Sequence, residues 1–176
     1  MRRLALLLLA ACVLLAPAGC KRKRNRAPVA PVEETGLMAT MLNVGDPHAA
    51  TQLVKGFYPV ENNQWRWTAR SFTVSLHPPK QANQKGARLV LKFAIPDPVM
   101  AQLRPIKLAA KVNGLDLPTE EYTTPGDQTY TREVPASALS GDTITVDFLL
   151  DKFLPPSAAD QRELGVIVSA VGFEAK

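Results

Sequence analysis

The sequence contains little cysteine and histidine, and its first 32 positions hold no acidic residue. Two cysteines and two histidines in 176 residues leave little material for a metal site or a thiol enzyme. Neither histidine lies beside a serine or cysteine motif that suggests a nucleophile and its base. A glycine-rich phosphate loop is also missing. We therefore expect no metal, no cofactor and no catalytic residue.

The positive charge is confined to the N-terminus. The net charge is +5 with a pI near 9.4, but seven of the 21 basic residues precede Ala27. The rest of the chain therefore has 14 basic residues against all 16 acidic ones. A nucleic-acid-binding domain needs its positive charge on the folded surface, so the sequence excludes nucleic acid as a partner.

Residues 1–19 have the layout of a signal peptide. Arg2 and Arg3 precede an apolar run over residues 4–15, which is shorter than the roughly 20 residues that a membrane-spanning helix needs. This run fits the apolar core of a secretion signal.

The segment Leu15-Ala16-Pro17-Ala18-Gly19-Cys20 resembles a bacterial lipobox. The resemblance implies that Cys20 becomes the lipidated, membrane-anchoring first residue, carrying fatty acyl chains such as palmitate. With Cys12 removed, the mature chain would then hold no free thiol. The alternative is ordinary signal-peptidase cleavage after Ala18, because Ala-Pro-Ala has the small-x-small form.

The six residues that directly follow the proposed anchor form a basic segment, Lys21-Arg22-Lys23-Arg24-Asn25-Arg26. Basic residues near an anionic membrane contribute about 1 kcal/mol each, so this segment predicts a second membrane contact. A solvated spacer or a stop against translocation is the alternative. The predicted location is outside the cytoplasm, on the periplasmic face of a bacterial outer membrane.

We interpret residues 20–54 as the lipidated cysteine and a linker. Ala-Pro-Val-Ala-Pro-Val at 27–32 favours extended chain, and no sustained period follows it. Residues 37–42 form a possible partner-recognition segment within this linker.

Residues 55–176 alternate apolar and polar side chains, which is typical of strands. Asn113-Gly114 indicates a tight hairpin turn, and prolines fall between the alternating runs. The sequence predicts an all-β fold, a β-sandwich of two sheets. The predicted inward-facing residues are Phe72, Val74, Leu76, Leu89, Leu91, Phe93, Ile95, Ile106, Leu108, Ala110, Val112, Ile144, Val146, Phe148 and Leu150.

Two stretches carry candidate binding residues. Residues 56–68 offer aromatic faces that stack on sugars and polar groups that bond hydroxyls. Residues 153–166 present an acidic and a basic side chain before a buried strand. The candidate ligand-binding residues are Tyr58, Glu61, Trp65, Arg66, Trp67, Asp160 and Arg162. For Trp67, a place in the core is the favoured interpretation, because tryptophan is highly buried on average.

The motif Phe-Tyr-Pro-x-Glu, then Trp-Arg-Trp-Thr and a late Asp-x-Arg-x-Leu-Gly-Val resembles a β-sandwich accessory domain. Such domains accompany bacterial envelope glycosyltransferases and membrane proteins and belong to the galactose-binding, jelly-roll class. The resemblance runs from about Gly56 to Glu174. It implies a carbohydrate-binding role, with Glu61, Trp67, Asp160 and Arg162 at its motif positions.

These features predict a non-catalytic envelope lipoprotein that binds an envelope glycan. The alternative is an assembly protein that holds a protein partner in an envelope complex. A hydrolase using Glu61, Asp160 or Glu163 is the least favoured class. We expect Glu61, Arg66, Asp160 and Arg162 to cluster at one end of the sandwich, either as a binding site or as a salt-bridge network that only closes that end.

Overall fold

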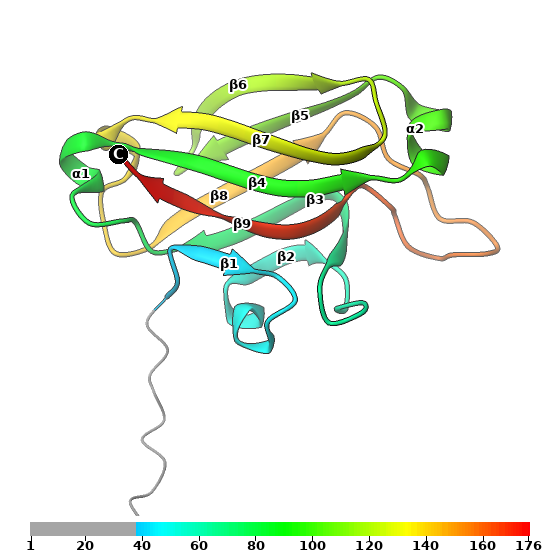
Figure 1. The fold of residues 1–176 in the computed structure, drawn as a ribbon, viewed down its shortest axis with the longest axis horizontal. Helices are drawn as coiled ribbons and strands as arrows, with labels where there is room; N and C mark the ends of the chain where they lie inside the picture. The colour runs from blue at the N-terminus through cyan, green and yellow to red at the C-terminus, as the bar shows by residue number, and fades with distance from the viewer. Residues whose placement is uncertain (1–37) are drawn as a thin grey trace, which may run out of the picture. The chain divides into compact units, whose positions relative to one another are not determined.

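The computed structural model describes residues 38–176, in which nine strands form a β-sandwich (Figure 1). The predicted all-β, two-sheet class is confirmed. The signal peptide, Cys20, the basic segment 21–26 and the linker up to residue 37 lie outside the described residues. The strands are β1 (Met41–Asn43), β2 (Leu53–Phe57), β3 (Arg66–Leu76), β4 (Ala87–Ile95), β5 (Ile106–Val112), β6 (Leu115–Tyr122), β7 (Gly126–Val134), β8 (Ile144–Leu150) and β9 (Ile167–Ala175).

Strand β3 links the two sheets because its two halves pair with different neighbours. Its first residues, Arg66 and Trp67, pair with β9, whereas Ser71–Leu76 pair with β8. One sheet therefore holds β7, β4 and β9 with β1 beside β9, and the other holds β6, β5, β8 and β3 with β2 beside β3. All pairings are antiparallel.

The core lies between the sheets, where the inward-facing residues predicted from alternation are all buried. Period-two alternation sends successive side chains to opposite faces, so each strand contributes one apolar row. The rings of Phe72 and Phe148 stack at 4.9 Å in the centre. The hairpin at Asn113-Gly114 is confirmed, because both residues have the positive φ values, 46° and 84°, that the turn requires.

Pro118 corrects the expectation that every proline lies between strands. It falls inside β6, an edge strand, where a missing N–H leaves no ladder bond unmade. Its free carbonyl accepts hydrogen bonds from Tyr130 Oη at 2.9 Å and Arg132 Nε at 2.8 Å, both on β7. These bonds join the edge strands of the two sheets and close that side of the sandwich.

The predicted linker boundary at residue 54 is wrong, because the fold includes residues from Met41 onward. Strand β1 pairs with β9, and Leu42 and Val44 are buried in the core. A 3₁₀ helix, η1 (Pro47–Thr51), follows, and Gln52 is buried with its amide bonded to the Ala39 and Ser75 carbonyls. The proposed recognition segment 37–42 thus ends in a core strand.

The loops gather at the two ends of the sandwich (Figure 1). At one end lie the turn before β3, the segment after β8 and α2 (Asp97–Leu103). At the other end lie the segment after β3, α1 (Ala82–Lys85) and the turn after η2 (Ala136–Ala138). Among the described residues, no helix is long and apolar enough to cross a membrane.

Candidate functional site

Arg162 joins two carboxylates from distant parts of the chain. Its Nε and Nη2 donate to Asp160 Oδ1 and Oδ2 at 3.0 and 2.8 Å, and its Nη1 donates to Glu61 Oε1 at 3.0 Å. All three side chains are partly exposed, with 31–37% of their surface accessible. The fork of a guanidinium fits a carboxylate in two places at once, which fixes both groups in one plane. We call Glu61, Asp160 and Arg162 the Arg162 cluster.

Glu61 is placed by a tight turn before β3. The backbone N–H of Glu61 donates to the Trp65 carbonyl at 2.9 Å, and Asn62 and Asn63 between them have φ values of 51° and 54°. Asparagine tolerates this left-handed region better than most residues. Tyr58 lies just before the turn, and the Arg162 guanidinium sits 5.3 Å from its ring centroid. Tyr58, one of the candidate ligand-binding residues, therefore lies beside the Arg162 cluster.

Arg66 does not join the cluster, which corrects the prediction of a four-residue charge group. Its Nε donates to the Val44 carbonyl at 2.8 Å and its Nη1 to the Tyr58 carbonyl at 3.1 Å. Both bonds go to main-chain oxygens, so Arg66 ties the segment after β1 to the segment before the turn. Within residues 38–176, Arg66 forms no salt bridge with a carboxylate.

The two tryptophans are both half-buried. Trp67 packs against the hydrophobic core, as the favoured interpretation of this residue predicts. Trp65 closes the turn through its main-chain bridge to Glu61.

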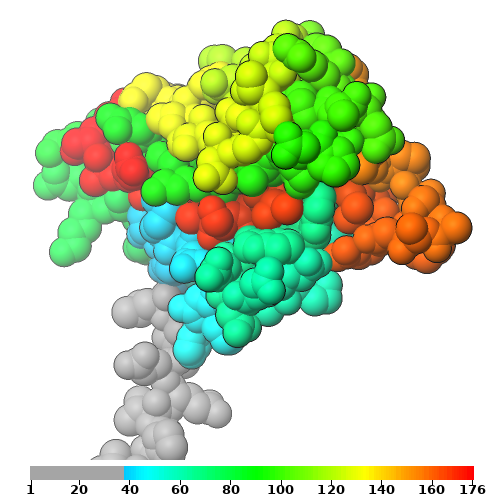
Figure 2. Space-filling view, turned by 45° about the vertical axis from the view of Figure 1, so that its right-hand side comes forward, coloured from blue at the N-terminus to red at the C-terminus, as the bar shows by residue number. Residues whose placement is uncertain are grey.

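A groove adjoins the cluster on the segment that follows β8. It has a volume of about 250 Å³, and its walls are Gln102, Leu154, Pro155, Pro156, Ser157, Asp160, Arg162 and Leu164. The segment is shaped by two main-chain bonds of 2.9 Å between Leu154 and Leu164. Figure 2 shows it, in orange, projecting beside the green surface of α2. We call this cavity the Arg162 groove.

Asp160 and Arg162 hold each other in their charged forms. Hydrogen bonds from the Arg162 side chain and backbone N–H lower the pKa of Asp160 below its usual value of 3.8, and Asp160 and Glu61 in turn raise the pKa of Arg162. Asp160 is therefore ionised at neutral pH and accepts hydrogen bonds only. Within residues 38–176, no group of three or more histidine, cysteine, aspartate or glutamate side chains could hold a metal ion.

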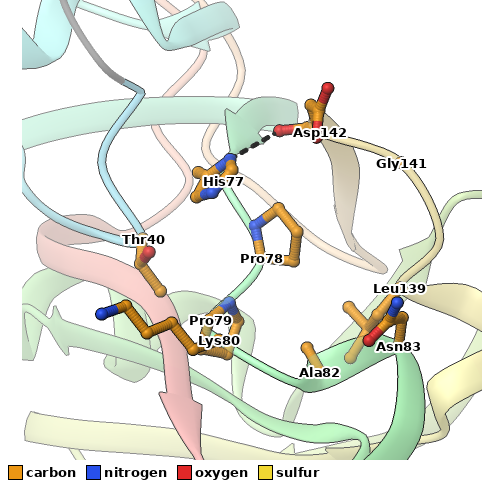
Figure 3. Close-up of a pocket in the computed structure, with 10 residues that line it drawn as sticks. All are labelled: Thr40, His77, Pro78, Pro79, Lys80, Ala82, Asn83, Leu139, Gly141 and Asp142. Carbon is orange, nitrogen blue, oxygen red and sulfur yellow. Dashed lines mark hydrogen bonds between the residues drawn. The ribbon is translucent and has the colours of Figure 1, made fainter.

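A larger cavity lies at the opposite end of the sandwich, and the sequence did not single it out (Figure 3). Its volume is about 420 Å³, and His77, which directly follows β3, contributes to its wall. The Nδ1 of His77 bonds the Asp142 carbonyl at 2.9 Å. We call this cavity the His77 pocket. Three separate segments supply its walls, so no contiguous motif could have predicted it; its residues are Thr40, His77, Pro78, Pro79, Lys80, Ala82, Asn83, Leu139, Gly141 and Asp142.

Comparisons with known proteins assign no family. No family model matches the chain, and no curated protein matches it by sequence. Among solved structures, it is similar to the CBM36-1 domain of a multidomain xylanase from the hindgut metagenome of Trinervitermes trinervoides. The identity is 11% and the TM-score 0.42, over 73% of this chain and 94% of that one.

The chain is also similar to two further solved structures. One is a family 35 carbohydrate binding module from an environmental isolate, with 15% identity, a TM-score of 0.38 and coverage of 82% of this chain and 90% of that chain. The other is the GH115 4-O-methyl-α-glucuronidase BtGH115A, with 12% identity and a TM-score of 0.47, over 85% of this chain but 19% of the enzyme. At these identities and TM-scores, the likeness assigns neither a family nor a ligand.

Proposed function

We propose that this chain is an exported lipoprotein whose β-sandwich binds an envelope carbohydrate in the Arg162 groove without catalysing a reaction. One observation carries the proposal. The same groove holds polar groups that are fixed in one plane and a wall of aliphatic side chains. Asp160 and Arg162 offer an acceptor and a donor side by side, and Gln102 adds an amide.

This combination fits a sugar ring better than an ion or a purely apolar ligand. A sugar hydroxyl both donates and accepts, so a neighbouring carboxylate and guanidinium bind it together. The carbon faces of the ring are apolar, and the Leu154, Pro155 and Leu164 side of the groove supplies a matching surface. Because Arg162 is held by two carboxylates before any ligand arrives, little side-chain entropy is lost on binding.

The same charges argue against glycoside hydrolysis at this site. A general acid must carry a proton at working pH, and its pKa is normally raised for that purpose. Arg162 lowers the pKa of Asp160 instead, and Glu61 shares the same guanidinium. The site therefore acts by binding.

The anchor is part of the proposal, through Cys20 and the basic segment 21–26, on the periplasmic face of the outer membrane. The acyl chains on Cys20 would insert into the membrane, and the basic segment would provide a second, electrostatic attachment to anionic lipids. Mass spectrometry of the mature N-terminus tests it. A lipidated Cys20 is the expected first residue, and an unmodified Gly19 start contradicts the anchor.

Carbohydrate binding is tested on a glycan array with the full-length chain in mild detergent. Arg162→Ala should reduce binding at least tenfold. Arg88→Ala is the matched control, because Arg88 also bridges two carboxylates, Glu133 and Glu174, but on the outer face of a sheet. Binding that survives Arg162→Ala rejects the Arg162 groove. An array without any bound glycan favours the assembly role instead.

A further inference from the structure

The His77 pocket and the Arg162 cluster lie at opposite ends of the sandwich, and between them runs the 11-residue strand β3, which is about 35 Å long at roughly 3.3 Å per residue. Arg66 begins this strand and bonds the segment that holds Tyr58, while His77 directly follows its last residue. We propose that the His77 pocket is a second binding site, for an uncharged saccharide unit, and that it acts independently of the Arg162 groove.

The floor of the pocket is apolar and rigid. Pro78 and Pro79 line it, together with Ala82 and Leu139, whose exposed surfaces are only 2% and 1%. The Ala82 N–H donates to the Pro79 carbonyl at 3.0 Å, which fixes the prolines against α1. Proline rings have no rotamers to lose, so a sugar ring placed on this floor buries its carbon face at low entropic cost.

The rim of the pocket carries hydrogen-bonding groups that no other described residue uses. Among residues 38–176, the side chains of Lys80, Asn83 and Asp142 form neither a hydrogen bond nor an ion pair with the protein. The Arg162 cluster differs, since its members bond one another. Free donors on Lys80 and Asn83 and a free acceptor on Asp142 match the two-way hydrogen bonding of sugar hydroxyls.

His77 holds the wall in place. Its backbone N–H donates to the Ala39 carbonyl at 3.1 Å, and its ring bonds the Asp142 carbonyl at 2.9 Å. A carbonyl oxygen can only accept, so Nδ1 carries the hydrogen of this bond. The dashed line in Figure 3 marks this bond, which links the end of β3 to the turn after η2.

The charges of the rim favour an uncharged ligand. Among the residues that line the pocket, Lys80 and Asp142 carry one charge of each sign, and Figure 3 shows them on different sides of the pocket. The lining therefore has no net charge that would select an anion or a cation, whereas hydroxyl groups can bond to either side chain. The volume of about 420 Å³ is within the range of roughly 300–1,000 Å³ that small-molecule pockets occupy.

Two saccharide sites at opposite ends would make the domain bivalent, a consequence that rests on the proposed function of the Arg162 groove. A long glycan that reaches both ends binds more tightly than the sum of single contacts suggests. Two separate chains, one at each end, would be cross-linked. The domain would then attach an envelope polysaccharide at two points to one anchored protein.

The test is an NMR titration of the isotopically labelled full-length chain in mild detergent. The probes are glucose, galactose, N-acetylglucosamine and glucuronate. At least one neutral sugar should shift the backbone amide signals of Asn83, Gly141 and Asp142. The double substitution Asn83→Ala, Asp142→Ala should weaken this binding at least tenfold. Gln84→Ala with Asp127→Ala is the matched control and should leave it unchanged.

Each result separates this site from the Arg162 groove. Shifts at the His77 pocket that persist in Arg162→Ala support an independent site, even if the groove binds nothing. The proposal is overturned if none of the neutral sugars shifts these amides, if glucuronate alone does so, or if the shifts survive the double substitution. Shifts of these amides that disappear in Arg162→Ala likewise overturn it, because a site that acts independently does not need the Arg162 groove.

Discussion

The guanidinium of Arg162 lies 3.0 Å from the Glu61 carboxylate although 101 positions separate the two residues in sequence. Glu61 belongs to the turn before β3, and Arg162 to the segment between β8 and β9. Because β3 lies beside both β8 and β9, the fold brings the two segments to the same end. Among residues 38–176, their ion pair is the only salt bridge or side-chain hydrogen bond that joins the turn to that segment.

Glu61→Gln should loosen the segment that carries the groove while the sandwich keeps its stability. The substitution weakens the cross-link and preserves the Asp160–Arg162 pair. Exposed ion pairs contribute little to global stability, so the melting temperature should stay within about 3 °C of wild type. Hydrogen exchange at the Leu154 and Leu164 amides should become roughly threefold to tenfold faster.

Glu174→Gln is the matched control for this measurement, because Glu174 pairs with Arg88 on a sheet. It should leave the exchange of Leu154 and Leu164 unchanged. Equal exchange in wild type and Glu61→Gln would show that the main-chain bonds between Leu154 and Leu164 alone order the segment.

The strands with regular alternation could be predicted from the sequence, and the irregular ones could not. Strands β4, β5 and β8, and β3 from Phe72 onward, each place an unbroken apolar row inward, so a period of two identifies them. Strand β1 has three residues with one inward side chain, Leu42, which is too short for any period. Strand β7 has the polar residues Gln128 and Arg132 on the side that faces the core, which interrupts its apolar row. The guanidinium of Arg132 donates a hydrogen bond to the Pro118 carbonyl on β6.

Only part of the candidate site could be predicted. The sequence shows which charged residues are present, but not which of them pair in the folded chain. Two loops that precede neighbouring strands can approach each other, which brought Glu61 to Arg162. Nothing in the sequence distinguishes Arg162, which bonds carboxylates, from Arg66, which bonds two carbonyl oxygens. The choice depends on which acceptors the folded backbone leaves free.

Asp160 should titrate at a lower pH in the wild type than in Arg162→Ala. Arg162 lowers the pKa of the Asp160 carboxyl below 3.8, and its removal should return the pKa toward that value. A lowered pKa in the folded state means that the pair stabilises the protein above pH 3.8 and that this contribution is lost as the pH falls through the folded pKa. Carbon-detected NMR of the carboxyl group measures the shift, and identical titration curves would contradict the pairing.

Stability should fall as the pH rises above 10 because of two buried tyrosines. Burial raises the pKa of Tyr130 from 10.0 to about 12, against an opposing effect of Arg132, and burial likewise raises the pKa of Tyr122. A raised pKa in the folded state means that the contribution is complete below pH 10 and is lost between pH 10 and 12.

Urea unfolding at a series of pH values measures this slope. Tyr130→Phe should make the decline above pH 10 shallower. It should also cost about 1 kcal/mol at neutral pH, because the hydrogen bond to the Pro118 carbonyl is lost. An unchanged slope would mean that Tyr130 ionises in the folded state as easily as in the unfolded chain.

The N-terminal boundary of the domain should be visible as a difference between two truncations. A chain that starts at residue 38 keeps Leu42 and Val44, whose exposed surfaces are 3% and 0%, whereas one that starts at residue 55 loses them. Burial of each such side chain stabilises by roughly 1.5–3 kcal/mol, a large part of the 5–15 kcal/mol that typically holds a domain together. The shorter chain should therefore melt at least about 10 °C lower, or not fold cooperatively.

In the full-length chain, Val44→Ala should lower the free energy of unfolding by about 2 kcal/mol. Val54→Ala is the control and should lower it little, because Val54 is 59% exposed. Equal thermal melting of both truncations would return residues 41–54 to the linker.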